Sequence, residues 1–140
     1  MKTYATSIEI SATAERVWSA LIDGLQNDPV PFGILKIEGN LSLHSRIRLW
    51  SEIDPKRVFV LRVVVFQAPR KMVWQGGMPL GLFTGTRTFA LSATGDTTTF
   101  DMQEVFGGLM SGLIMKTIPD LNPSFEKFAK TLKEKAESNE

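Results

Sequence analysis

Hydrophobic and polar residues alternate along much of the chain, and the alternation is interrupted at short groups of glycine, proline, asparagine and aspartate. Alternation with a period of two residues is typical of strands with one buried face, and the interruptions are typical of turns. The pattern predicts a first strand over residues 4–11 and, after a gap, about six more strands. The later strands are expected over residues 34–39, 46–52, 58–67, 71–77, 82–92 and 97–106.

Three stretches follow a helical period instead. Residues 11–23 place apolar side chains on one face, and Ser11 or Thr13 is suited to cap the start of that helix. After residue 106 the helical period returns, and Asn122 followed by Pro123 predicts the start of a long last helix. Its apolar stripe, and that of a shorter helix before it, are Phe125, Phe128, Ala129, Leu132 and Ala136, and Leu109, Met110, Leu113 and Ile114.

The order of these elements predicts an α+β fold. Short connections favour a continuous antiparallel sheet, because parallel strands need long crossovers. A curved sheet with one apolar face must cover that face, and the last helix is the expected cover. Since a sheet that curves around a helix is difficult to fill completely, we expect a cavity between them.

One arginine and one glutamate lie on the apolar face of the last two predicted strands. In residues 85–106, alternation places Arg87 and Glu104 on the same side as Phe89, Phe100 and Met102. Gly95-Asp96 suits a two-residue hairpin turn, and counting back from it sets Arg87 opposite Glu104. A slip by one residue would break this pairing. The sequence therefore predicts an ion pair on the concave face of the sheet.

Three roles are open for this pair. It can be a structural ion pair near the rim of the sheet, because pairing offsets the penalty of burying either charge. It can be a polar anchor that orients an otherwise apolar ligand. Glu104 can also act as a general acid or base.

Other side chains are candidates for the wall or mouth of the expected cavity. Trp74 is expected to point inward, Met102 and Met110 suit a site of irregular shape, and Phe32 can close the mouth. The candidate ligand-binding residues are Arg87, Glu104, Trp74, Phe89, Met102, Phe106, Phe32, Leu49 and Met110. We assign no catalytic residue, because no nucleophile with a base is visible, and no metal or cofactor, because His44 is the only histidine.

Composition narrows the class of protein. The chain has 140 residues and a formal net charge of +1, which supplies no broad basic field for nucleic acid. There is no cysteine, and no apolar stretch reaches the roughly 18 residues that span a bilayer. We expect a single domain over residues 1–140 that is soluble and cytoplasmic, either a monomer or a weak homodimer.

Several segments together resemble the START-like or SRPBCC superfamily, and bacterial polyketide cyclase/dehydrase-like members most closely. They are AERVWSALID, KIEG, APRKMVW, GTRTFAL, TTTFDMQEVFGG and FEKFAKTLKEKAE, which cover nearly the whole chain in order. The chain departs from many relatives at Arg87, where they have histidine. The resemblance implies a helix-grip fold with a deep, mostly hydrophobic cavity between the sheet and the last helix.

Three functions are consistent with these observations. The first is binding of a small hydrophobic, lipid- or polyketide-like molecule without catalysis. The second is a cyclase or dehydrase in which Glu104 or Arg87 steers proton transfer. The third is a protein-interaction module like the chaperone activators of the superfamily, for which an exposed apolar patch around GLMSGLIM (residues 108–115) would be the sign.

Overall fold

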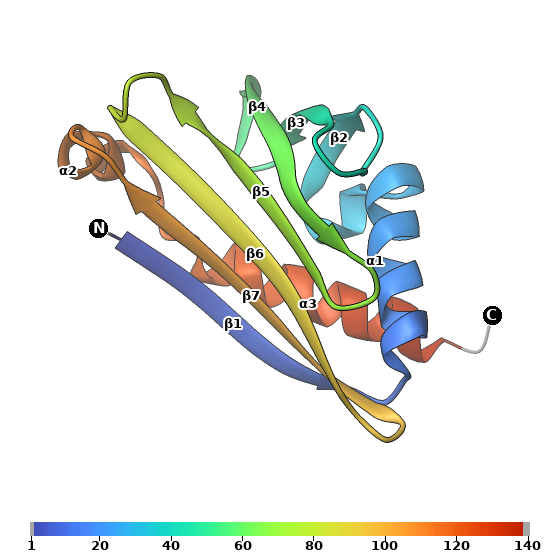
Figure 1. Cartoon of the computed structure of the whole chain (residues 1–140). Coiled ribbons are helices and arrows are strands. Elements are labelled where there is room, and N and C mark those ends of the chain that lie inside the picture. The colour runs from blue at the N-terminus through green and yellow to red at the C-terminus, as the bar shows by residue number, and fades with distance from the viewer. Residues whose placement is uncertain (1, 139–140) are drawn as a thin grey trace.

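The structure is a computed structural model that describes residues 2–138. Its centre is a bent seven-stranded sheet in which every neighbouring pair is antiparallel, in the order β1-β7-β6-β5-β4-β3-β2 (Figure 1). The strands are β1 (Lys2–Ile10), β2 (Ile34–Glu38), β3 (Arg46–Ser51), β4 (Asp54–Gln67), β5 (Lys71–Met78), β6 (Phe83–Thr94) and β7 (Thr97–Gly107). The predicted antiparallel sheet is confirmed.

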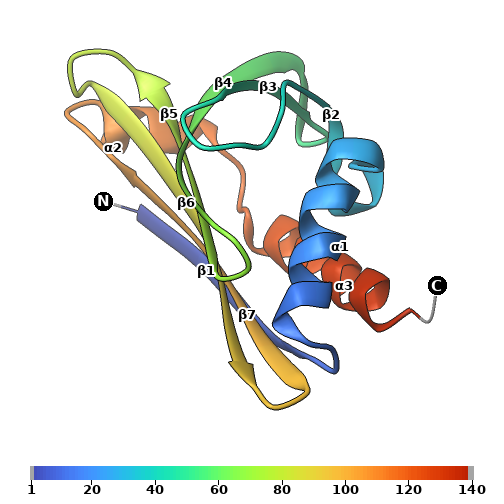
Figure 2. The ribbon, with the colours of Figure 1, turned by 45° about the vertical axis from the view of Figure 1, so that its right-hand side comes forward.

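Helices cover the inner face of this sheet, and Figure 2 shows α1 and α3 together on that side. The helical segments are α1 (Ala14–Asn27), η1 (Val30–Phe32), α2 (Ser111–Ile114), η2 (Met115–Thr117) and α3 (Asn122–Glu137). The long last helix therefore grips the sheet as the sequence predicts, and the helix-grip α+β fold is confirmed. No helix within residues 2–138 has the length and apolar character needed to cross a bilayer.

The β6–β7 hairpin has the register that its turn predicts. Thr94 lies opposite Thr97, and Arg87 lies opposite Glu104. Gly95 has a φ of 64°, which the first central position of a type II′ turn requires and which glycine adopts without strain. The turn chemistry therefore fixes which side chains meet on the inner face.

The helix starts agree only in part with the sequence prediction. Thr13 caps α1, because its Oγ1 accepts a hydrogen bond from the Arg16 N–H at 3.2 Å. Asn122 does not cap α3. Instead it donates its own N–H to Oδ1 of Asp120 at 3.0 Å, so that the aspartate satisfies a free N–H at this helix start.

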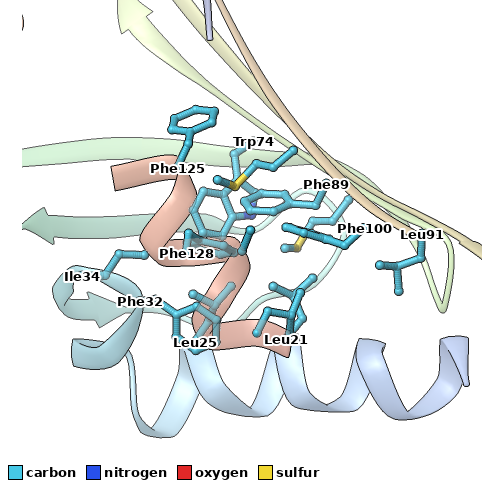
Figure 3. Close-up of a cluster of buried hydrophobic side chains, with 14 of the residues drawn as sticks. Leu21, Leu25, Phe32, Ile34, Trp74, Phe89, Leu91, Phe100, Phe125 and Phe128 are labelled. Atoms are coloured by element: carbon cyan, nitrogen blue, oxygen red, sulfur yellow. The ribbon is translucent and has the colours of Figure 1, made fainter. Parts of the chain in front are cut away.

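Large side chains fill the space between the sheet and α3. Figure 3 shows Phe125 and Phe128 of α3 among Trp74, Phe89 and Phe100 of the sheet, all of them buried. The Phe128 ring lies 5.8 Å from that of Phe89 and 6.1 Å from that of Phe100. A cavity that admits water would leave accessible surface on its walls, and Phe89 and Phe100 have none. The expectation of a cavity in this part of the fold is therefore wrong.

Candidate functional site

Arg87 and Glu104 form an ion pair on the inner face of the sheet. Nε of Arg87 donates to Oε1 of Glu104 at 2.7 Å, and Nη2 of the same guanidinium lies 2.6 Å from the same oxygen. The side chains of Arg87 and Glu104 are only 22% and 15% exposed. The pair is therefore largely withdrawn from water, as the hairpin register predicts.

Aromatic side chains surround the pair on three sides. Along the same row of the sheet, Tyr4 of β1 lies opposite Glu104, and Trp74 of β5 lies opposite Arg87. From α3, the ring of Phe125 covers the guanidinium, with Cζ of Arg87 4.9 Å from the ring centroid. This is cation–π geometry, which stabilises a cation that has lost part of its hydration.

One oxygen of Glu104 is left without a partner. Both contacts from Arg87 converge on Oε1, and Oε2 accepts no hydrogen bond from residues 2–138. Gly85 lies beside it on the same face, where a Cβ would be 3.2 Å from Oε2. The same Cβ would lie 3.4 Å from the Phe106 ring, and Gly85 is buried, so glycine at this position lets Glu104 and Phe106 pack closely over the strand.

The row of residues beyond Gly85 forms an aromatic rim. Phe106 lies opposite Gly85, and its ring stacks on that of Phe83 at 5.8 Å. Phe106 is buried, whereas Phe83 is partly exposed. Met115 and Ile118, from the segment between β7 and α3, are partly buried against the hydrophobic core. The stacked rings of Phe83 and Phe106 therefore make this rim apolar.

Trp74 has a buried polar atom without a partner. Its side chain is 2% exposed, and Nε1 donates no hydrogen bond within residues 2–138. The indole packs edge-on against Phe89, with centroids 4.7 Å apart. A buried donor without an acceptor is uncommon, and it costs free energy compared with a paired donor.

The remaining candidate residues do not gather at the pair. Phe89 and Met102 lie one row deeper, in the packed core. Phe32 is buried in η1, where its ring lies 4.8 Å from that of Phe128, so it anchors a loop. Leu49 is buried in β3 opposite Phe59, and Met110 precedes α2.

Two hollows in the structure lie away from the pair. One, of about 330 Å³, lies between α1 and the end of α3, where Arg16, Asp23, Asp28 and Lys135 contribute to its lining. The other, of about 300 Å³, lies along β1 and β7 between residues 5–7 and 101–103. Neither has the apolar, enclosed character expected of a lipid-like ligand site.

Three residues at the pair were not among the sequence candidates: Tyr4, Phe125 and Gly85. Tyr4 has the same alternation as Ile8 and Ile10 on β1, so the strand pattern could have found it. Phe125 belongs to the predicted apolar stripe of α3, but its position over Arg87 depends on how that helix crosses the sheet. The alternation does not point to Gly85, because it is a pattern of apolar and polar side chains and glycine has no side chain.

Two carboxyl groups outside this site have a lowered pKa. The pKa of Glu137 is lowered mainly by the hydrogen bond from Lys133, and also by the one from the Ser11 N–H. The pKa of Glu38 is lowered mainly by the hydrogen bond from Lys36. Within residues 2–138, no group of three His, Asp or Glu side chains is placed to hold a metal ion.

Comparison with solved structures shows where this architecture recurs. Protein MLL2253 from Mesorhizobium loti is 14% identical, with a TM-score of 0.73 and 99% of each chain covered. Truncated norcoclaurine synthase from Thalictrum flavum is 15% identical, with a TM-score of 0.72 over 99% of this chain and 95% of that one. Protein jhp0584 from Helicobacter pylori is 12% identical, with a TM-score of 0.74 over 95% and 86%. At these identities the likeness is one of fold.

Among curated proteins, none matches the chain. The model of one family, described as polyketide cyclase/dehydrase and lipid transport, matches residues 1–137. That match covers the β6–β7 hairpin, the ion pair and the last helix together. The chain therefore belongs to the polyketide cyclase/dehydrase and lipid transport family, of SRPBCC type.

Proposed function

We propose that the chain binds a small, largely apolar molecule on the inner face of the sheet, beside Arg87 and Glu104. The observation that carries this proposal is Oε2 of Glu104, which accepts no hydrogen bond within residues 2–138 although the pair is largely withdrawn from water. An apolar wall with one oriented polar group is how sites for small ligands fix a ligand's direction. Membership of the family supports a role of this general kind.

The polar group of the ligand should be a hydrogen-bond donor. Oε2 of Glu104 can only accept while the carboxylate is ionised, so a hydroxyl, phenol or amine suits it. The apolar remainder would lie against Phe83 and Phe106, whose stacked rings form the rim. A ligand with only acceptor groups at this end would leave both itself and Oε2 unsatisfied.

Entry requires the segment over residues 108–118 to move, because the core behind the pair is filled. This segment contains α2 and η2, and neither has a buried residue. Its side chains contact the core mainly through the partly buried Met115 and Ile118, and the backbone of its first residues is hydrogen-bonded to the β5–β6 turn. Few buried apolar contacts make a segment easy to displace, so we expect ligand to replace these side chains against the rim.

Binding is better supported than catalysis. Glu104 accepts a hydrogen bond from Nε of Arg87 and is ion-paired with its Nη2, and such a carboxylate is well suited to orient a ligand. Proton transfer would need it positioned against a reacting atom with a partner base or acid, and no such set is present beside it within residues 2–138. We place this function in the cytoplasm and expect the protein to act as a monomer or weak homodimer.

Native mass spectrometry of protein purified from its own host tests the proposal. We expect a co-purifying small molecule, and its occupancy should fall at least about tenfold in Glu104→Gln and in Gly85→Val, whose side chain would crowd Oε2 and the Phe106 ring. Glu52→Gln is the matched control, because Glu52 pairs with Lys127 at the surface. Absence of any bound molecule, or equal occupancy in all three variants, would contradict the proposal.

A further inference from the structure

Two loops meet at one end of the sheet. The turn between β5 and β6 and the start of the segment after β7 lie together in both ribbon views (Figures 1 and 2). Backbone hydrogen bonds join them: the Leu109 N–H donates to the Gly81 carbonyl at 3.1 Å, and the Met110 N–H donates to the Leu82 carbonyl at 2.7 Å. The two loops therefore form one platform whose backbone groups are already partly satisfied.

This platform exposes four aliphatic side chains, which we call the apolar tip: Met78, Leu80, Leu109 and Leu113. They are 43%, 91%, 86% and 63% exposed, respectively. Isolated exposed leucines are common on proteins, but a contiguous exposed group of them usually marks a contact surface. The predicted stripe of residues 109–114 is thus turned outward at its two leucines.

The backbone of Leu80 is a second observation in favour of an external binding role for the tip. It has a φ of 60°, in the left-handed region that a leucine adopts only with strain. Glycine or asparagine would adopt this conformation more easily, and a polar residue would be better hydrated. Leu80 therefore contributes neither burial nor relaxed geometry within the chain.

The segments that carry the tip contain a lysine and no acidic residue. In residues 78–83 and 107–119 the one charged residue is Lys116, which is exposed, and the exposed Asp120 follows the second segment. Lys2 lies opposite Phe106 at the same end of the sheet and is also exposed. The nearest acidic residue on β7 is Glu104, which is paired with Arg87.

We propose that the apolar tip docks on an anionic lipid surface. Protruding aliphatic side chains beside lysines match the apolar and anionic layers of a membrane interface. A protein partner is favoured less, because the four residues of the tip include none of the tryptophan, tyrosine or arginine that usually anchor protein interfaces. This contact would be a peripheral one, and it does not depend on which molecule the inner face holds.

Co-sedimentation with vesicles tests this inference. The wild-type protein should partition onto vesicles of phosphatidylcholine with phosphatidylglycerol, and the Leu80→Ser/Leu109→Ser variant should bind them at least about tenfold more weakly. Lys116→Gln should weaken binding to these vesicles but not to vesicles of phosphatidylcholine alone, because only the former carry net charge. Both variants should keep the thermal midpoint of the wild type, since the three side chains are exposed.

Leu43→Ser is the matched control. Leu43 is 49% exposed in the loop between β2 and β3, and the next residue, His44, donates its N–H to Val63 of β4, so this leucine lies outside the tip. Its loss should leave vesicle binding unchanged. The inference is overturned if the wild type does not partition, or if the tip variant and Leu43→Ser behave alike. It is also overturned if the tip proves to mediate self-association, abolished by Leu80→Ser/Leu109→Ser, without lipid binding.

Discussion

Arg87 and Glu104 lie on the inner face of the sheet, where the alternation along β6 and β7 otherwise places apolar side chains. Withdrawing either charge from water is unfavourable, and the short contacts to Oε1 together with the Phe125 ring offset that cost. The offset depends on both partners. We therefore expect replacement of either residue alone to destabilise the protein more than replacement of both together.

Arg87→Met should lower the free energy of unfolding by about 2–3 kcal/mol, because it leaves Glu104 unpaired among aromatic rings. The loss is smaller than that expected for a fully buried ion pair, since the side chains of Arg87 and Glu104 are still 22% and 15% exposed. The double variant Arg87→Met/Glu104→Leu should lose less than Arg87→Met alone. Urea unfolding of Arg87→Met, Glu104→Leu and the double variant measures these losses, and a double loss equal to the sum of the two single losses would mean that the two charges do not interact.

At the scale of elements, the β6–β7 hairpin could be predicted to the residue, because its two-residue turn and its alternation point to the same register. α3 begins at Asn122, as the Asn122-Pro123 pair predicts, but the side-chain oxygen at this start comes from Asp120 and accepts from the Asn122 N–H. The outward orientation of Leu109 and Leu113 could not be predicted. A helical period shows that residues share a face, and it does not show whether that face meets the core.

Two glycines of these elements make a matched test of the backbone. Gly77 has a φ of 134°, and a Cβ there would lie 2.2 Å from the Phe83 carbonyl oxygen on the paired strand. Gly77→Ala should therefore destabilise the protein by about 2 kcal/mol or more. Gly112 in α2 has nothing within 4 Å of its Cβ position, so Gly112→Ala should be neutral or stabilising by up to about 1 kcal/mol. Thermal unfolding separates them, and equal effects would refute this account.

For the whole molecule, the fold class followed from the order of the elements, but the filled interior did not. Alternation identifies Trp74, Phe89 and Phe100 as inward-facing, and it says nothing about the volume that remains between them and α3. That volume depends on how far the sheet bends and on where Phe128 enters it. The candidate site is accordingly smaller than the sequence suggests, and it lies toward one end of the inner face.

Glu137 joins the end of α3 to the connection between β1 and α1, because it accepts from the Ser11 N–H at 2.8 Å and from Lys133 at 2.6 Å. Because folding lowers the pKa of this carboxyl group, the bonds add stability above its ordinary pKa of 4.5, and that stability is lost as pH falls through the lower folded pKa. Glu137→Gln should therefore lower the thermal midpoint slightly at pH 7, and the difference should vanish in more acidic solution.

Circular dichroism at several pH values measures that difference. Glu134→Gln is the control on the same helix, since Glu134 is exposed and makes no ion pair within residues 2–138. It should show no comparable change with pH. A Glu137→Gln deficit that persists well below pH 4.5 would mean that the residue acts through packing rather than through its charge.

The strand order has a consequence for synthesis on the ribosome. β1 is hydrogen-bonded only to β7, so Lys2–Ile10 emerges from the exit tunnel long before Thr97–Gly107 is available to pair with it. α3, whose Phe125 ring packs against Tyr4 of β1, emerges later still. In a nascent chain this strand therefore stays unpaired through most of translation. During that period a ribosome-associated chaperone would protect it from aggregation.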